Sequence, residues 1–336
     1  MDLKDCLLGD VVTFQRGHDL PKAQMVDGPY PVLGSNGIIG YHNRYTTTGP
    51  VIVVGRSGNV GHPFMVKSNA WAHNTSLYIK DFKGNDPIFI YYFLQTLNLA
   101  KFAGGSAVPT LNRNHINTIE VKIPKDVSVQ KKIGSILASF DEKISTNNKI
   151  NDNLLKLWEA RTRKLLDSAA TTPTLIGEIC RPKQWKTLTK SELTTGAPID
   201  VYGAGGVIGQ TREPNHNERV IGVVCRGAGC GTLMVIDPPS YVTGNVMCLD
   251  NITNQVGLPC LYAILKDRGL SDIVSGSAQP QITGSSIKNT YINLPNYEVC
   301  NRITKEGGQT FDMININKRE NEHLTRIRDL LLSKLF

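Results

Sequence analysis

The side chains whose types and spacing could carry out chemistry are polar groups in and after glycine turns, in both halves of the chain. Arginine, lysine, asparagine and glutamine can donate paired hydrogen bonds to base edges, while arginine, lysine and small polar groups can hold phosphates. The residues that we select on this ground are Arg56, Asn59, His73, Asn74, Arg113, Asn114, Arg226, Asn245, Gln279, Gln281 and Lys288. For each of them, turn capping or exposure to solvent is the alternative.

Enzyme chemistry has one candidate string, Asp237-Pro238-Pro239-Ser240-Tyr241, which resembles the [DN]-P-P-aromatic loop with which adenine methyltransferases hold the target amine. Its aromatic residue is one position late, and we favour a turn between strands because Asp-Pro is ordinary turn chemistry. The glycine-rich stretch 203–209 lacks the register of a dinucleotide fingerprint, and the sequence has neither a G-x-x-x-x-G-K-[ST] string nor H-E-x-x-H. We therefore predict no catalytic residue and no cofactor.

The seven cysteines form an odd set, and no pair has the C-x-x-C spacing of a zinc site. We expect free thiols in a reducing cytoplasm and no metal site. Neither an export signal nor an apolar run of membrane-spanning length is present, so the chain is expected to be soluble, cytoplasmic and not bound to membrane. The net charge of +8 favours a polyanionic partner.

The elements that must position these residues belong to an internal sequence repeat, whose two copies lie about 170 residues apart. Residues 31–40 return as 200–209, residues 51–61 as 220–231, and residues 105–116 as 276–287. In this alignment Arg56 and Arg226 occupy the same place, which suits a structural or phosphate-contacting role. Base specificity is expected where the copies differ, such as 17–27 and 210–219.

Each copy ends in a long segment with the apolar pattern of a helix. Residues 130–167 contain no proline and carry seam positions at 4-3-4-3 spacing, while 299–336 carries Leu324, Ile327, Leu330, Leu331 and Leu335 after an interruption at Gly307-Gly308. We expect the two helices to pack antiparallel. The positions assigned to the spacer helices and subunit interface are Ile133, Leu137, Phe140, Ile144, Leu154, Trp158, Leu324, Ile327 and Leu331.

Polar residues at seam positions, Asn147, Asn151 and Arg161, either fix the register of the helices or face a partner subunit. The predicted fold class is α/β (α+β), with two domains related by a pseudo-two-fold axis and separated by two long antiparallel coiled-coil helices. The predicted boundaries are 1–128 and 171–297 for the domains, and 129–170 and 298–336 for the spacer helices.

Over nearly its full length the chain resembles the specificity subunits of Type I restriction-modification systems. The resemblance lies in Leu8-Gly9-Asp10-Val11, the Gly55-Arg56-Ser57-Gly58 turn, the 130–133 helix entry, the 175–179 entry to the second domain and the 324–335 terminal string. It implies two target-recognition domains, a bipartite asymmetric site on double-stranded DNA, and assembly with two methyltransferase subunits and with restriction subunits, which would carry out methylation and cleavage.

Two other functions remain open from the sequence. One is a fragment of a DNA adenine methyltransferase, which methyl-donor binding by the isolated chain would reveal. The other is a scaffold that holds partner proteins and binds DNA only through charge, with equal affinity for all duplexes and a steep dependence on salt.

Overall fold

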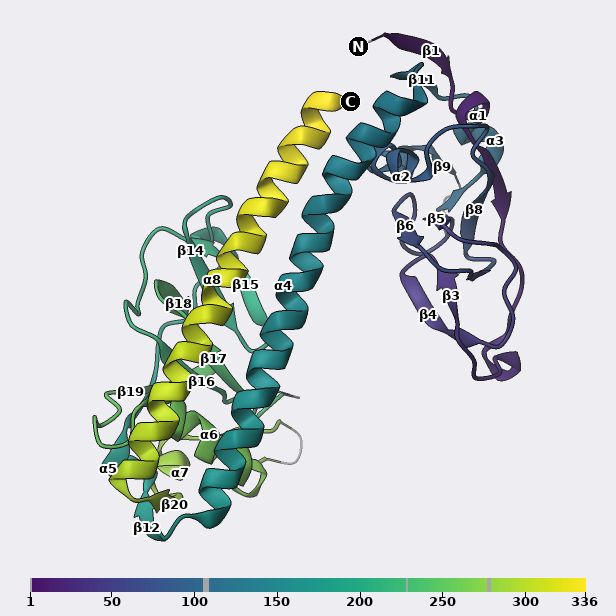
Figure 1. The fold of residues 1–336 in the computed structure, drawn as a ribbon. Coiled ribbons are helices and arrows are strands. Elements are labelled where there is room, and N and C mark those ends of the chain that lie inside the picture. Colours follow the sequence, from purple (N-terminus) through teal and green to yellow (C-terminus); the bar gives the residue numbers. More distant parts are fainter. Residues whose placement is uncertain (1, 105–108, 228, 277–278) are drawn as a thin grey trace. The chain divides into compact units, whose positions relative to one another are not determined.

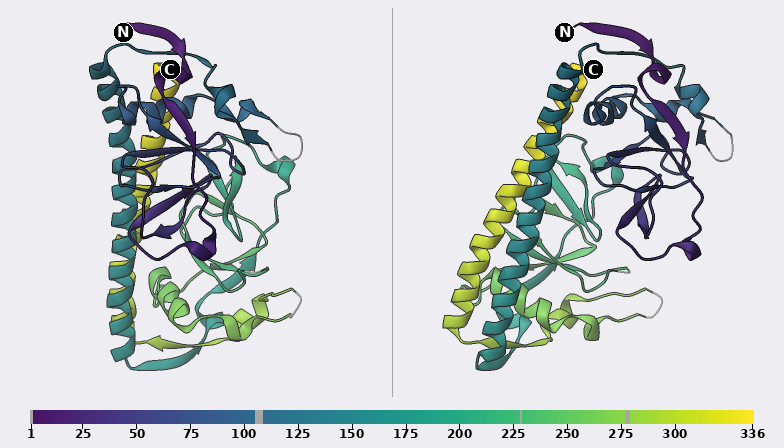
Figure 2. Two further views of the ribbon diagram at one scale, coloured as in Figure 1. Left: turned by 90° about the vertical axis from the view of Figure 1, so that its right-hand side faces the viewer. Right: turned by 45° about the vertical axis from the view of Figure 1, so that its right-hand side comes forward.

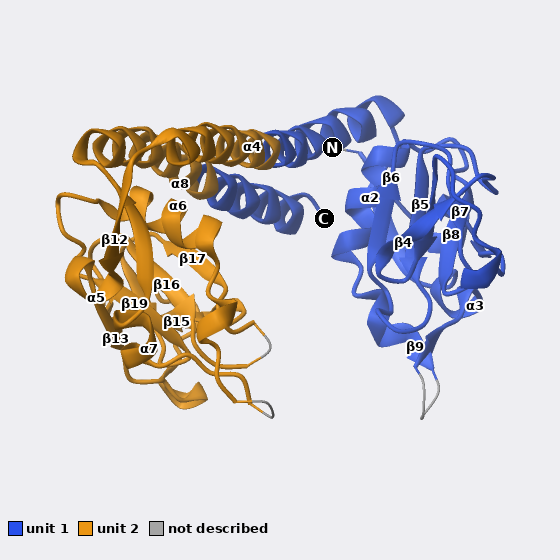
Figure 3. Cartoon of the chain, turned by 90° about the horizontal axis from the view of Figure 1, so that it is seen from below, with its two compact units in different colours: residues 1–146, 320–336 blue, residues 147–319 orange. Residues whose placement is uncertain are grey.

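The computed structural model describes residues 2–104, 109–227, 229–276 and 279–336. It divides into two compact units, coloured separately in Figure 3. Unit 1 comprises residues 1–146 and 320–336, and unit 2 comprises residues 147–319. Each unit therefore contains one repeat together with part of each long helix, and each is described by itself.

Unit 1 is built on two small sheets. The four-stranded sheet has the order β2 (Thr13–Arg16), β8 (Ser76–Asp81), β5 (Val51–Gly55) and β6 (Pro63–Val66). The three-stranded sheet has the order β4 (Gly37–His42), β3 (Tyr30–Gly34) and β7 (Trp71–Ala72), and β3 and β7 are parallel. The remaining strands form two pairs, β1 (Leu3–Leu7) with β11 (Glu120–Pro124) and β9 (Ala103–Gly104) with β10 (Thr110–Leu111).

Helices complete unit 1: α1 (Leu8–Val11), α2 (Pro87–Thr96), α3 (Arg113–Ile116) and the 3₁₀ turns Lys22–Gln24 and Leu99–Phe102. Asp86 caps α2 by accepting a hydrogen bond from the Phe89 amide at 2.9 Å. The apolar face of α2 belongs to a core that also contains Leu137 and Leu332 from the long helices. The helices are thus part of the unit's hydrophobic core.

Unit 2 repeats the sheet orders of unit 1. Its four-stranded sheet is β13 (Arg181–Gln184), β19 (Val246–Asp250), β16 (Val220–Val224) and β17 (Leu233–Ile236), and its three-stranded sheet is β15 (Gly206–Thr211), β14 (Ile199–Gly203) and β18 (Ser240–Val242). The other elements are the pair β12 (Thr171–Leu175) and β20 (Tyr291–Pro295), helices α5 (Ile176–Ile179), α6 (Leu258–Arg268) and α7 (Gly284–Lys288), and the 3₁₀ turns Lys190–Glu192 and Ser271–Ile273. The predicted repeat is confirmed at the level of strand order.

The two predicted long helices are α4 (Val127–Ser168) and α8 (Tyr297–Leu335), which lie side by side in Figures 1 and 2. In unit 1, Arg328 Nη1 lies 2.5 Å from Asp141 Oδ1 and Lys143 Nζ lies 3.4 Å from Glu320 Oε2. In unit 2, Asn317 donates to Asn151 at 2.7 Å. The ring centroids of Trp158 and Phe311 lie 5.1 Å apart in the same unit. Within each unit the partners move in opposite directions along the two helices, so the helix segments run antiparallel.

Most of the predicted seam positions face inward. Ile133, Leu137 and Trp158 are buried, and Phe140, Ile144, Leu154, Leu324 and Leu331 are half-buried. Asn147 and Asn151 are also buried, which favours the register role proposed for them.

Three seam positions do not lie on the packed face. Arg161 is exposed, which agrees with the alternative that it faces a partner subunit, and Ile327 and Leu330 are exposed to 46% and 60%. The inward face near the end of α8 instead passes through Arg328, whose guanidinium contacts Asp141, and through Leu332, which is buried. A charged residue on the packed face cannot be recognised from an apolar pattern.

The predicted interruption at Gly307-Gly308 is also wrong, because α8 is continuous there. A Cβ on Gly307 would lie 2.5 Å from Pro259 Cβ and 2.9 Å from Trp158 Cζ2, whereas one on Gly308 would meet nothing within 4 Å. Gly307 therefore allows α8 to approach α4 and α6 closely.

Among the described helices, none combines the length and the apolar character that a membrane crossing requires.

Candidate nucleic-acid interface

In unit 1 the glycine turn after β5 joins the segments that contain most of the predicted binding residues. The Arg56 amide donates to Thr75 O at 2.8 Å, and Arg56 O accepts from the Leu111 amide at 2.9 Å. A Cβ on Gly55 would lie 1.8 Å from Asn59 O, so only glycine fits at the base of this turn. The turn thereby brings the 73–75 and 110–114 segments together.

Three arginines line one concavity beside this turn: Arg16 at the end of β2, Arg56, and Arg113 at the first position of α3. Arg113 is exposed, and the nearest carboxylate of Arg16 is Asp19 at 4.0 Å. Three arginines lining one concavity form a site suited to phosphate. Arg113 stands after Asn112, whose side chain caps α3 by accepting from the Asn114 amide at 3.0 Å.

Sequence analysis missed Arg16, because nothing in its local sequence distinguishes it. It reaches the concavity through the pairing of β2 with β8, in which Arg16 is opposite Leu77. That pairing is nonlocal.

Of the other predicted residues of unit 1, two have exposed side chains and two have side chains with polar contacts inside the unit. Asn59 and Asn114 are exposed. His73 is half-buried, and its Nδ1 lies 3.0 Å from Thr75 Oγ1, while Asn74 donates its side-chain amide to Asp19. The contacts of His73 and Asn74 agree with a structural role for them as well as with binding.

The backbone hydrogen bonds of unit 2 show which of its residues corresponds to Arg56 of unit 1. The Cys225 amide donates to Asn245 O and Cys225 O accepts from the Ile282 amide, each at 3.0 Å, which is the pattern that Arg56 makes in unit 1. Arg226 forms a bridge with Gln281, as Ser57 does with Thr110. The prediction that Arg56 and Arg226 occupy the same place is therefore wrong by one residue.

This shift removes the arginine cluster from unit 2. Gln184, Cys225 and Gly284 stand where Arg16, Arg56 and Arg113 stand in unit 1. Gln184 donates to Gly244 O at 2.9 Å, and Cys225 is fully buried. The two units thus present different chemistry at the same position of the fold.

The remaining candidates of unit 2 lie around the turn after β16, with one exception. Arg226, Asn245, Gln279 and Gln281 are exposed, and Arg226 and Gln281 are bridge partners. Lys288 ends α7 and packs against Gly177 of α5, on the segment that leads into β20. Parts of the predicted glycine turns, 105–108 and 277–278, lie outside the described residues.

Comparison with known proteins matches this architecture. Residues 2–156 and 173–326 each match the Type I restriction modification DNA specificity domain. A type I specificity subunit of Mycoplasma genitalium is 25% identical over 319 residues, covering 88% of this chain and 82% of that protein. The specificity subunit of the type I restriction enzyme MjaVIII of Methanocaldococcus jannaschii is 21% identical to this chain. The match covers 98% of this chain and 90% of the M. jannaschii protein.

A solved structure shares the fold. The crystal structure of the Type-I restriction-modification system S subunit from M. genitalium superimposes with a TM-score of 0.73 at 20% identity, covering all of this chain and 96% of that one. Since two copies of one domain model account for nearly all residues, the chain belongs to the family defined by the Type I restriction modification DNA specificity domain.

Proposed function

We propose that this chain is the sequence-specific DNA-binding subunit of a Type I restriction-modification complex and recognises a bipartite, asymmetric site on double-stranded DNA. The observation that carries the proposal is the duplicated DNA specificity domain. Each copy places a glycine turn, and polar side chains around it, at the same position of the fold. Two similar domains with different side chains at that position suit a target whose two halves differ in sequence.

Phosphate contact and base recognition belong to different groups in this proposal. In unit 1, Arg16, Arg56 and Arg113 hold the backbone, because guanidinium groups gathered in one concavity suit the phosphate charge. The exposed Asn59 and Asn114 can reach base edges. In unit 2 the exposed Arg226, Gln279 and Gln281 make the contacts to phosphates and base edges.

We further propose that the chain has no catalytic site and that its partners carry out methylation and cleavage. The contacts around Asp237 support this. Its carboxylate accepts from Arg219 Nε at 2.6 Å, and Arg219 also contacts Asp312 of α8 at 2.9 Å. The hydroxyl of Tyr241 donates to Lys186 O at 3.0 Å. Both groups that could hold a target amine are therefore engaged within the fold.

Binding of methyltransferase subunits, and through them restriction subunits, is assigned to the outward faces of the long helices. Large apolar residues are exposed there, in contrast to the buried seam residues: Ile136, Ile327 and Leu330 in unit 1, and Ile150, Leu157, Met313 and Ile316 in unit 2. Exposed apolar groups on a helix otherwise rich in charge are typical of a protein interface.

Methylome sequencing tests the proposal. Cells that express the chain with its methyltransferase partner are compared with cells that lack only this chain. We expect methylation at one split motif in the first cells and its loss in the second. Unchanged methylation without the chain would contradict the proposal, and methylation spread over all sequences in its presence would favour the charge-driven scaffold.

A further inference from the structure

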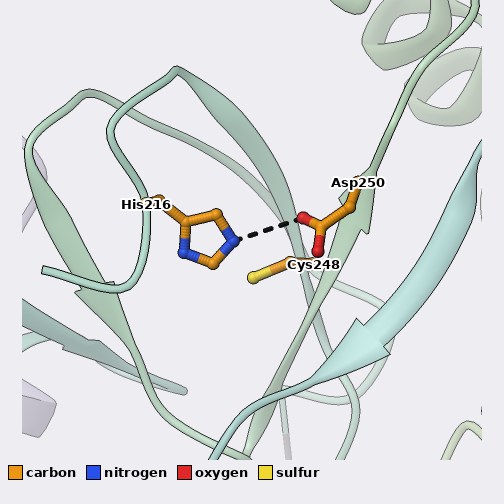
Figure 4. A group of neighbouring side chains, drawn as sticks. All are labelled: His216, Cys248 and Asp250. Carbon is orange, nitrogen blue, oxygen red and sulfur yellow. Dashed lines mark hydrogen bonds and ion pairs between the residues drawn. The ribbon is translucent and has the colours of Figure 1, made fainter.

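Three side chains with metal-binding atoms meet in unit 2 (Figure 4). His216 lies in the segment between β15 and β16, while Cys248 and Asp250 are two residues apart on β19 and so face the same side of that strand. His216 Nε2 lies 3.2 Å from Asp250 Oδ1, and the three potential ligand atoms lie within 4.8 Å of one another.

The hydrogen bonds around Asn215 determine which ring nitrogen of His216 carries a proton. Asn215 Oδ1 accepts from the Val242 amide at 2.9 Å, and Asn215 Nδ2 donates to Val242 O at 3.0 Å, so the orientation of this side-chain amide is fixed. His216 Nδ1 lies 2.7 Å from that same Oδ1 and must donate to it. In a neutral ring, Nε2 then presents a lone pair to Asp250.

Two electron-rich atoms at 3.2 Å require something positive between them. A second proton on the ring could supply it, and so could a metal ion. A histidine that binds a metal through Nε2 characteristically donates its other N–H to an oxygen, which is the arrangement that His216 has with Asn215.

Burial distinguishes this group from an exposed acidic cluster. Cys248 is fully buried, and the side chains of His216 and Asp250 are exposed to only 9% and 18%. A cation at this point would suit these groups, because it stabilises a thiolate and neutralises a carboxylate.

We propose that His216, Cys248 and Asp250 form a binding site for a divalent transition-metal ion of the zinc class. Nitrogen, sulfur and oxygen ligands together suit Zn²⁺, which takes four ligands in a tetrahedron and can complete its shell with water. Tetrahedral zinc places its ligand atoms about 3.3 to 3.8 Å apart. The distance of 3.2 Å between His216 Nε2 and Asp250 Oδ1 is close to this range, and all three potential ligand atoms lie within 4.8 Å of one another.

Such an ion would tie the 212–219 segment to β19. In unit 1 the matching segment holds Thr47, since Thr46 and Thr47 both donate their amides to Ala70 O as Asn215 and His216 do to Ser240 O. Tyr78 stands where Cys248 stands. Thr47 and Tyr78 offer neither an imidazole nor a thiol, so the corresponding position of unit 1 lacks these two ligands.

Metal binding by the purified full chain tests the proposal without reference to DNA. The chain is stripped of metal and titrated with Zn²⁺ against a chromophoric chelator, and separately with Co²⁺, whose bond to a thiolate gives near-ultraviolet absorption. We expect about one Zn²⁺ per chain and a thiolate–Co²⁺ band. Both should be lost in His216→Gln and Cys248→Ala. Cys230→Ala, on the glycine turn of the same unit, is the matched control and should behave as the unchanged chain does.

Circular dichroism of each variant establishes that it is folded, and Asp250→Asn provides a nearly isosteric third variant. The proposal is overturned if the unchanged chain shows no Co²⁺ band, or if His216→Gln and Asp250→Asn bind metal as tightly as the control. An unfolding temperature that responds to pH but not to Zn²⁺ or chelator would also overturn it and would indicate an imidazolium–aspartate pair.

Discussion

Replacing each of the adjacent glycines of α8 by alanine tests how closely the long helices pack in unit 2. Gly308→Ala should stabilise the chain by about 1 kcal/mol, because alanine is the better helix former and a Cβ there meets nothing within 4 Å. Gly307→Ala gains the same propensity, but its Cβ would lie 2.5 Å from Pro259 Cβ and 2.9 Å from Trp158 Cζ2. Overpacking of this kind costs about 1 to 3 kcal/mol.

The two variants should therefore differ by about 2 kcal/mol, with Gly307→Ala the less stable, which corresponds to about 4 to 8 °C in unfolding temperature for a unit of this size. Scanning calorimetry of the full chain measures the difference, and each glycine serves as the control for the other. A Gly307→Ala protein that unfolds at the temperature of Gly308→Ala, or above it, would refute the close approach of α8 to Trp158 and Pro259.

Arg113→Ala should weaken DNA binding by the assembled complex and reduce the magnitude of the slope of log K against log salt concentration by about 1. Lys122→Ala, whose Nζ pairs with Asp5 at 3.2 Å, is the control. An unchanged slope in Arg113→Ala would show that Arg113 does not contact phosphate. Asn151→Ala should cost about 1 to 2 kcal/mol in denaturant unfolding, because it leaves Asn317 without its partner. A cost near zero would argue against that hydrogen bond. Cys180, whose pKa burial raises to about 12, should resist iodoacetamide at pH 8 in the native chain and react in urea, as mass spectrometry can show; modification of the native chain would contradict its burial.

Features with a local signature could be predicted from the sequence. The glycine spacing revealed the duplicated domain, and the apolar spacing gave both long helices, since each pattern is a property of consecutive residues. Asn147 and Asn151 were located on the packed face for the same reason.

Features that depend on nonlocal pairing could not be predicted. The arginine alignment was wrong because the unit 2 turn, from Val224 to Gly231, is one residue longer than that from Gly55 to Gly61, and only the hydrogen bonds show where the extra residue lies. Arg16 reaches the site through strand pairing. The three ligands of the proposed metal site come from two segments that have no zinc-type spacing.

The position of Gly307 illustrates the same limit in the helices. A glycine pair in a helical pattern predicts a break, but here one of the two is required by the side chains packed against it. That packing involves Pro259, which is distant in sequence.

Exchange of one recognition domain tests the central claim most directly. Residues 1–125 are replaced by the corresponding segment of a relative that directs methylation to a different target, and the methylome is sequenced with the partner subunits unchanged. The account predicts that one half of the split motif changes while the other half and the two-part form of the motif persist. A motif that stays the same, or one that changes in both halves, would contradict recognition by two separate domains.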